Sequence, residues 1–102
     1  MRILHVLDHS LPLQSGYVFR TLAILAHQRK RGWETFHLTT PKQTTDFRPH
    51  ETIEGWDFHR TPPVTGLADR APVIREIAQM RATTRRLAEV AAEIRPDVLH
   101  AH

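Results

Sequence analysis

The fold is decided by the stretch Ile3-Leu4-His5-Val6-Leu7-Asp8-His9-Ser10-Leu11-Pro12-Leu13-Gln14-Ser15-Gly16-Tyr17. Residues Arg2 to Leu7 are rich in branched apolar types without regular alternation, which is typical of a strand buried on both faces by helices. A loop punctuated by Pro12 and Gly16 follows, and then a helix begins. This order places a helix N-terminus at the carboxyl end of a strand, where α/β sheets bind ligands and backbone N–H groups can meet an anion. We therefore expect a phosphate or sugar-phosphate site here.

Helical periodicity follows this loop. A stripe of apolar residues predicts a helix from Tyr17 or Val18 to Arg31, which Gly32 ends. The stripe consists of Val18, Leu22, Leu25 and Ala26, widened by Phe19 and Ala23. Trp33 to Thr40 is rich in aromatic and β-branched types and predicts a second strand, closed by Pro41. Strand, helix and strand together form a right-handed βαβ unit.

The second half of the chain repeats this alternation. Lys42 to Gly55 is polar and predicts a surface loop, in which Thr52 to Glu54 adds a short edge strand. Trp56 to Thr61 alternates apolar and polar residues and predicts a third strand, whereas Val64 to Ala71 has no assignable structure. A helix is expected from Pro72 to the stop at Pro96, and a fourth strand from Asp97 to His102. The apolar stripe of this helix consists of Ile74, Ile77, Ala78, Thr84, Leu87, Ala88, Ala91 and Ile94.

The element order β-α-β-β-α-β indicates an α/β protein with an open, mostly parallel, Rossmann-like sheet and helices on both faces. The strand from Arg2 to Leu7 is expected to be central. A length of 102 residues suits one domain. Because a parallel strand ends the chain without the crossover that normally follows, we expect residues 1–102 to be the first part of a larger domain.

Composition excludes several classes of protein. Apolar residues make up 40% and charged residues 25% of the chain, as in ordinary globular proteins. The net charge is only +3, and Arg29-Lys30-Arg31 is too short for a basic track, so a solvated helix end is favoured over a nucleic-acid partner. Cysteine is absent, which excludes disulfides and thiolate ligands. The apolar N-terminal run is too short for a signal peptide or a membrane span, which favours the cytoplasm.

Glycine and histidine supply the candidate binding residues. Gly16 fits either a turn with positive φ, which is favoured, or a close approach of backbone to phosphate. The sequence contains neither G-x-G-x-x-G nor a Walker loop, which weakens the nicotinamide and NTPase interpretations. His100 and His102 lie two apart in a strand and so share a face, but no third ligand follows at a recognisable spacing. A packed or hydrogen-bonded pair is therefore favoured over a zinc site, and His9 lies near the same ligand-binding edge.

Acid–base pairs are scarce in this sequence. Asp8 follows the first strand and Asp97 precedes the last, so in a parallel sheet they would lie at opposite ends and could not form a carboxylate dyad. Asp8 is expected to cap the loop or hold a neighbouring histidine. No Ser-His-Asp arrangement with a nucleophile elbow is visible. Trp33 and Trp56 begin strands and are expected to pack in the core or at its rim.

The assembled residues resemble a known family. They are Arg2-Ile3-Leu4-His5-Val6-Leu7, the loop with Ser15-Gly16, the helix end Arg31-Gly32-Trp33-Glu34, and Pro96-Asp97-Val98-Leu99-His100-Ala101-His102. Together they look like the start of a retaining glycosyltransferase of the GT-B fold, family four (glycosyl transferase group one). The stretch His9 to Tyr17, with Thr39-Thr40-Pro41-Lys42-Gln43, is similar to the glycosyltransferases that accompany exosortase systems in bacterial exopolysaccharide loci. The likeness extends over the chain but over only the first part of a family member.

The resemblance implies a hexosyltransferase-type enzyme. Its nucleotide-sugar donor would be bound mainly by a second Rossmann-like domain, and a glycan or lipid-linked acceptor mainly by the domain begun here. Family members usually carry two adjacent glycines near the donor phosphate and the acceptor, and here Ser15 replaces the first. The implied donor-phosphate and acceptor loop is therefore Ser15, Gly16 and Tyr17, and His9, His100 and His102 would border the interdomain cleft.

The same resemblance places the catalytic residues beyond residue 102 and implies no cofactor and no metal ion. A cytoplasmic protein is expected, with room for peripheral association of the full-length protein with the inner face of the membrane. A non-catalytic α/β domain that binds a nucleotide or a partner protein is the alternative, followed by a fragment of an oxidoreductase.

Overall fold

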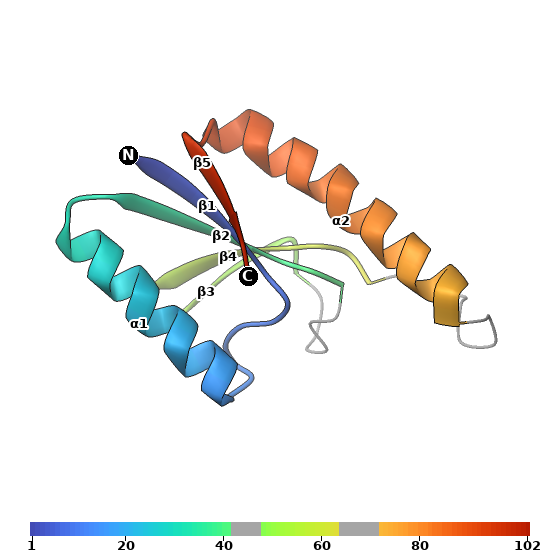
Figure 1. Ribbon diagram of the computed structural model, residues 1–102, viewed down its shortest axis with the longest axis horizontal. Helices are drawn as coiled ribbons and strands as arrows, with labels where there is room; N and C mark the ends of the chain where they lie inside the picture. The colour runs from blue at the N-terminus through green and yellow to red at the C-terminus, as the bar shows by residue number, and fades with distance from the viewer. Residues whose placement is uncertain (42–47, 64–71) are drawn as a thin grey trace.

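The computed structural model describes residues 1–41, 48–63 and 72–102, which hold two helices and five strands (Figure 1). In chain order these elements are β1 (Arg2–Leu7), α1 (Gly16–Lys30), β2 (Glu34–Thr39), β3 (His50–Ile53), β4 (Trp56–Arg60), α2 (Pro72–Ile94) and β5 (Val98–Ala101). Each element that the sequence predicts is present, with bounds that differ by a residue or two. The predicted loop from Val64 to Ala71 lies outside the described residues, as do residues 42–47 of the loop that begins at Lys42.

The five strands form one mixed sheet in the order β3-β4-β2-β1-β5. β1 pairs in parallel with β2 and with β5, and β2 pairs in parallel with β4. β3 is antiparallel to β4 at the edge of the sheet. The predicted α/β class and the mostly parallel sheet are confirmed, and β1 is an interior strand as expected, although the middle strand of the five is β2. Because β1 and β5 are parallel neighbours, the loop that follows β1 and the residue His102 that follows β5 lie at the same carboxyl edge of the sheet.

The two helices lie on opposite faces of the sheet (Figure 1). Successive residues of a strand point to opposite faces, so Leu4 faces α2 while His5 and Leu7 face α1. The core beneath α2 consists of Leu4, Leu38, Val90 and Ile94. The core at the start of α1 consists of Leu7, Leu11, Val18 and Phe58. β1 therefore contributes to both cores, as its unbroken apolar pattern predicts.

Only the C-terminal half of α2 packs on the sheet. Val90 and Ile94 are buried, whereas Ile74 and Ile77 are exposed, so their predicted place in the packed stripe is wrong and Val90 was missed. The reason is length: α2 has 23 residues, about 35 Å of helix, and strands of four to six residues reach only about 13–20 Å. Its first half therefore extends past the carboxyl edge (Figure 1). In the part of the chain that the structure describes, neither helix combines the length and the apolar composition needed to cross a membrane.

The buried stripe of α1 is narrower than the sequence predicts. Val18, Thr21 and Leu25 are buried at spacings of three and four, whereas Phe19 and Ala23 are exposed and do not widen the stripe. Thr21 tolerates this position because its hydroxyl donates to the Tyr17 carbonyl, at 2.9 Å. The sheet face beneath the C-terminal half of α1 is polar, so a narrow apolar line is sufficient there.

Two glycines end their elements in the left-handed backbone region. Gly32 has φ 83° just beyond α1, which confirms the predicted helix stop. Gly55 has φ 82° and follows Glu54 with φ 53°, so the two form the tight connection between β3 and β4. Two successive residues with positive φ match the twist of a two-residue hairpin. The predicted edge strand at Thr52 to Glu54 thus becomes β3, and it starts slightly earlier.

Candidate functional site

The loop between β1 and α1 gathers three of the predicted site residues. The His9 ring packs on the Tyr17 ring, with their centroids 4.7 Å apart. Its Nε2 lies 3.1 Å from the Ser15 hydroxyl and its Nδ1 lies 3.1 Å from an Asp8 carboxylate oxygen. The expectation that Asp8 holds a neighbouring histidine is confirmed. His9, Ser15 and Tyr17 therefore form one connected group at the carboxyl edge of the sheet.

The Asp8–His9–Ser15 contacts follow the order of a Ser-His-Asp triad, which the sequence did not reveal. The Ser15 hydroxyl also accepts the Val18 N–H, at 3.2 Å, and so acts as the N-cap of α1. A cap oxygen is held toward the helix rather than toward a substrate. We therefore assign these contacts to orienting His9 and the loop, and not to a nucleophilic serine.

Gly16 is the first residue of α1, and the preferred interpretation of a turn with positive φ is wrong. Its backbone lies outside the left-handed region, which Gly32 and Gly55 occupy. A Cβ placed on Gly16 would meet no atom within 4 Å, so the space beside it is open. The first N–H groups of a helix have no acceptor within the helix. The backbone N–H groups of Gly16 and Tyr17, in the first turn of α1, therefore lie beside an open space.

Tyr17 ties the start of α1 to the end of β1. Its hydroxyl accepts the backbone N–H of Asp8, at 3.0 Å. The ring also packs against the core formed by Leu7, Leu11, Val18 and Phe58. The Tyr17 side chain thus contacts the end of β1 through its hydroxyl and the core through its ring. These contacts fix the position of the α1 N-terminus relative to β1.

Arg60, on β4, holds the loop between β1 and α1 in place. The sequence did not predict this role. Its guanidinium is buried, donates to the Leu11 carbonyl at 2.7 Å and also donates to the Ser10 hydroxyl. Glu51 on β3 balances the charge, with an N–O distance of 2.8 Å. The Leu11–Pro12 peptide bond in this loop is cis. An arginine at the end of a predicted strand carries no local signal of this role, because the loop it holds is about 50 residues away.

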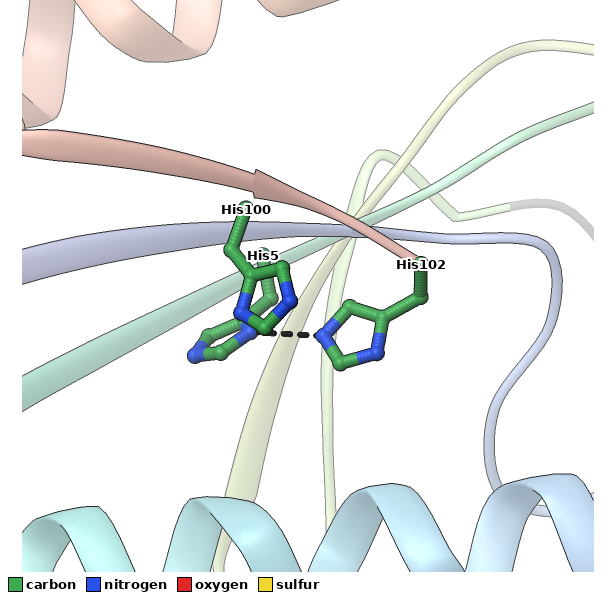
Figure 2. Close-up of side chains that lie close together, drawn as sticks. All are labelled: His5, His100 and His102. Carbon is green, nitrogen blue, oxygen red and sulfur yellow. Dashed lines mark hydrogen bonds between the residues drawn. The ribbon is translucent and has the colours of Figure 1, made fainter.

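A second group of side chains lies on β1 and β5, on the face toward α1 (Figure 2). The His100 and His102 rings stack with centroids 4.3 Å apart, so the predicted shared face is confirmed. His5 joins them: its Nδ1 lies 2.8 Å from His102 Nε2, and its ring lies 5.1 Å from that of His100. The sequence did not predict His5, because the register that pairs it with His100 depends on strand order. We call these three residues the histidine cluster.

Burial and repulsion between neighbouring rings lower the pKa of two members of the histidine cluster, His5 and His102. His5 is fully buried, and this burial lowers its pKa below the ordinary value, with His100 contributing. Partial burial of the ring, followed by repulsion from His100, His5 and Arg20, lowers the pKa of His102 to about 4. Gln28 on α1 accepts from His5 Nε2, at 2.8 Å. At neutral pH His5 and His102 therefore present uncharged imidazoles, and Gln28 on α1 fixes that of His5.

A polar network continues from the histidine cluster beneath α1. His37 on β2 is paired with His5 and is fully buried. Its Nδ1 donates to the Asp57 carbonyl at 2.6 Å, and its Nε2 lies 3.0 Å from the Thr35 hydroxyl. Arg29 also donates to Thr35, at 2.9 Å. Burial lowers the pKa of His37 to about 4, and the nearby Arg29 charge acts in the same direction.

Cavities open at both ends of the sheet. One of about 290 Å³ lies at the carboxyl edge between Asp8, Thr40 and the first half of α2. Another of about 910 Å³ lies at the amino edge, lined among others by Arg29, Trp33 and Glu34. The amino-edge cavity is larger, but ligands of α/β sheets bind at the carboxyl edge, where the predicted site residues lie. The smaller cavity lies at that edge beside α2, and Asp8 lines it, but His9, Ser15, Gly16 and Tyr17 do not.

Asp8 and Asp97 lie at opposite ends of the sheet, as the sequence predicts. The Asp97 carboxylate accepts the Arg2 N–H at the start of β1, at 2.8 Å, whereas Asp8 follows the end of the same strand. They cannot act as a carboxylate dyad. Trp56 packs at the rim, with the Arg29 guanidinium 4.2 Å from its ring centroid.

Comparison with known proteins adds no relative from which roles could be transferred. No family model, no curated protein and no solved structure matches the chain. The functions of the loop and of the histidine cluster are therefore argued from their own geometry and chemistry.

Proposed function

We propose that the chain is the N-terminal, acceptor-side part of a retaining GT-B glycosyltransferase of family four. The full-length protein would transfer a sugar from a nucleotide-sugar donor to a glycan or lipid-linked acceptor in exopolysaccharide synthesis. The proposal rests on the resemblance of the sequence to that family. It is supported by an α/β sheet in which β1 is an interior strand with a parallel neighbour on each side, as in sheets that bind ligands at their carboxyl edge.

One observation carries the proposal: the residues that the resemblance assigns to the loop after β1, and His102, lie at the carboxyl edge of the sheet. His9, Ser15 and Tyr17 form a connected group after β1. His102 follows β5, and its N–H donates to the Val6 carbonyl of β1, at 3.0 Å. Segments from the two ends of the sequence thus meet beside the N-terminus of α1. A cleft shared with a second domain would need this kind of edge.

The start of α1 has the electrostatics that a donor diphosphate requires. Sugar transfer leaves charge on the departing diphosphate, which N–H groups and a helix N-terminus stabilise. The first turn of α1 contains no acidic residue that would oppose an anion. Because Gly16 has no side chain and the space beside it is open, a phosphate could approach the backbone there.

Each loop residue then has a distinct role. Gly16 gives access to the backbone, Ser15 holds the helix start and Tyr17 fixes it to β1. His9 is oriented by Asp8 and Ser15 and borders the acceptor side of the cleft. Most donor contacts and the catalytic groups would come from the second domain, and no step at this loop needs a metal ion.

The test is a transfer assay on the full-length protein. We would measure transfer from radiolabelled UDP- and GDP-sugars to a lipid-linked or oligosaccharide acceptor for the wild type and Gly16→Val. We expect Gly16→Val to abolish transfer without altering the fold, because its side chain fills the space proposed for phosphate. The matched control is Ala23→Val, which adds bulk to an exposed position of the same helix.

Two outcomes would overturn the proposal. Wild-type transfer by Gly16→Val would remove the loop from the site. Absence of transfer with every donor, together with retained nucleotide binding, would favour the non-catalytic binding domain. Calorimetry on the 102-residue chain adds a separate check, because tight binding of a nucleotide sugar to this chain alone would contradict the assignment of donor contacts to a second domain.

A further inference from the structure

We propose that His5, His100 and His102 form a three-histidine site for Zn²⁺ or a similar divalent transition metal, with a fourth position open to water. The inference is independent of the proposed function. The three side chains each offer a ring nitrogen, and these nitrogens lie within 4.8 Å of one another. They project from two adjacent parallel strands toward the same face (Figure 2). Three imidazoles that converge in this way are a common ligand set for zinc with an open position.

The spacing of the nitrogens is close to what zinc requires. Tetrahedral zinc with Zn–N bonds of about 2.0–2.1 Å holds its ligand nitrogens about 3.3 Å apart. The pair His5 Nδ1 and His102 Nε2 is 2.8 Å apart, and no pair exceeds 4.8 Å. Adjustments of at most about 1.5 Å between ligand nitrogens are therefore enough to admit the ion. His100 and His102 are exposed and can rotate to make them.

Gln28 fixes the third ligand in the form that a metal needs. The Gln28 amide oxygen can only accept, so His5 Nε2 carries the proton and Nδ1 keeps its lone pair toward the cluster. Metal-bound histidines commonly donate their other N–H to such an acceptor, which orients the ring. His102 now donates from Nε2 to His5, so it would move this proton to Nδ1 when the metal binds. No proton need leave the site.

The chemistry of the ligands favours zinc and its neighbours over hard cations. Imidazole suits Zn²⁺, Cu²⁺ and Ni²⁺, whereas Mg²⁺ and Ca²⁺ prefer oxygen ligands. Arg20 lies close enough to His102 to repel a cation, which moderates the affinity without removing a ligand.

The site can be tested directly with metal ions. The 102-residue chain would be prepared without a polyhistidine tag, stripped with chelator and titrated with Zn²⁺ by calorimetry and with Co²⁺ by visible absorption. We expect one ion per chain and a Co²⁺ spectrum of tetrahedral intensity. His100→Ala and His102→Ala should each weaken binding at least ~10-fold. Both residues are exposed, so these variants should fold.

The second test addresses the positioning role of Gln28. Gln28→Leu should weaken Zn²⁺ binding about 10- to 100-fold, because His5 loses the acceptor that orients it. Gln28→Glu keeps an acceptor at the same place and should restore binding. A loss caused merely by disturbed packing would not be rescued in this way.

The second histidine pair of the protein provides the matched control. His50 and His59 have ring centroids 5.0 Å apart, and Asp57 lies 3.8 Å from His50. His50→Ala should leave Zn²⁺ binding unchanged. The proposal is overturned if no ion binds, if His100→Ala and His102→Ala bind as the wild type does, or if His50→Ala causes the main loss.

Discussion

Acidification should destabilise the protein through His37. This side chain is fully buried between β1 and β4, and burial lowers its pKa from 6.5 to about 4. The unfolded chain takes up a proton on this histidine near pH 6.5, while the folded chain does so only near pH 4. The stabilisation is therefore complete above pH 6.5 and is lost as the pH falls from 6.5 to about 4.

The size of this effect follows from the pKa difference. One pKa unit corresponds to about 1.4 kcal/mol, so the loss is about 2 kcal/mol between pH 7 and pH 5 and about 3 kcal/mol below pH 4. Urea unfolding of the wild type and of His37→Gln at pH 7, 6 and 5 measures it. Glutamine does not titrate, yet it can both donate and accept at this position.

The difference between the two pH profiles isolates His37, because His5 and His102 also have lowered pKa values and contribute equally to both proteins. We expect the unfolding free energy of His37→Gln to fall less steeply with acidification than that of the wild type. His27→Gln, at an exposed position on α1, is the control and should follow the wild type. Parallel profiles for wild type and His37→Gln would refute the reasoning.

Three further predictions concern single side chains. Arg60→Met should lower the unfolding free energy by about 3 kcal/mol in urea titrations, because it leaves the Glu51 carboxylate without its partner. By comparison, Arg2→Met removes an exposed ion pair and should lower the unfolding free energy by less than about 1 kcal/mol. Gly16→Ala should raise the unfolding free energy by about 0.4–1 kcal/mol, because its backbone is helical and the space is open, and a lower melting temperature would contradict this. Arg20→Gln should strengthen Zn²⁺ binding about 2- to 5-fold at low salt by calorimetry, and an unchanged affinity would show that its charge does not reach the cluster.

Local signals predicted most of the secondary structure. Glycine and proline mark the element ends, and the stops at Gly32 and Pro96 lie within a residue or two of the observed helix ends. The apolar run of β1 correctly indicated an interior strand covered on both faces, although the middle strand is β2. The packing of α2 could not be predicted in this way, because periodicity shows which face is apolar but not how far the sheet extends beneath it.

The candidate site was predicted where its contacts are local. His9 and Ser15 are six residues apart, and His100 and His102 are neighbours on one strand. His5 and Arg60 were missed because their partners are brought together only by strand order. Gly16 was given a positive φ because glycine often has one, whereas here it begins a helix at a place where a side chain would also fit.

The position of β1 between β2 and β5 has a consequence for how the protein is made. The backbone groups on the β1 edge that faces β2 can form their hydrogen bonds early, because β2 follows closely in the sequence: Asp8 and Thr40, which are hydrogen-bonded just beyond the two strands, are 32 positions apart. The opposite edge of β1 stays unpaired until β5 is made, because Arg2 is hydrogen-bonded to Asp97, 95 positions later. During translation the first strand to emerge therefore keeps an uncovered edge until β5, which begins 96 residues after Arg2, has left the ribosome. An exposed edge of this kind invites pairing with other chains, so a nascent chain is at its most vulnerable just before β5 arrives.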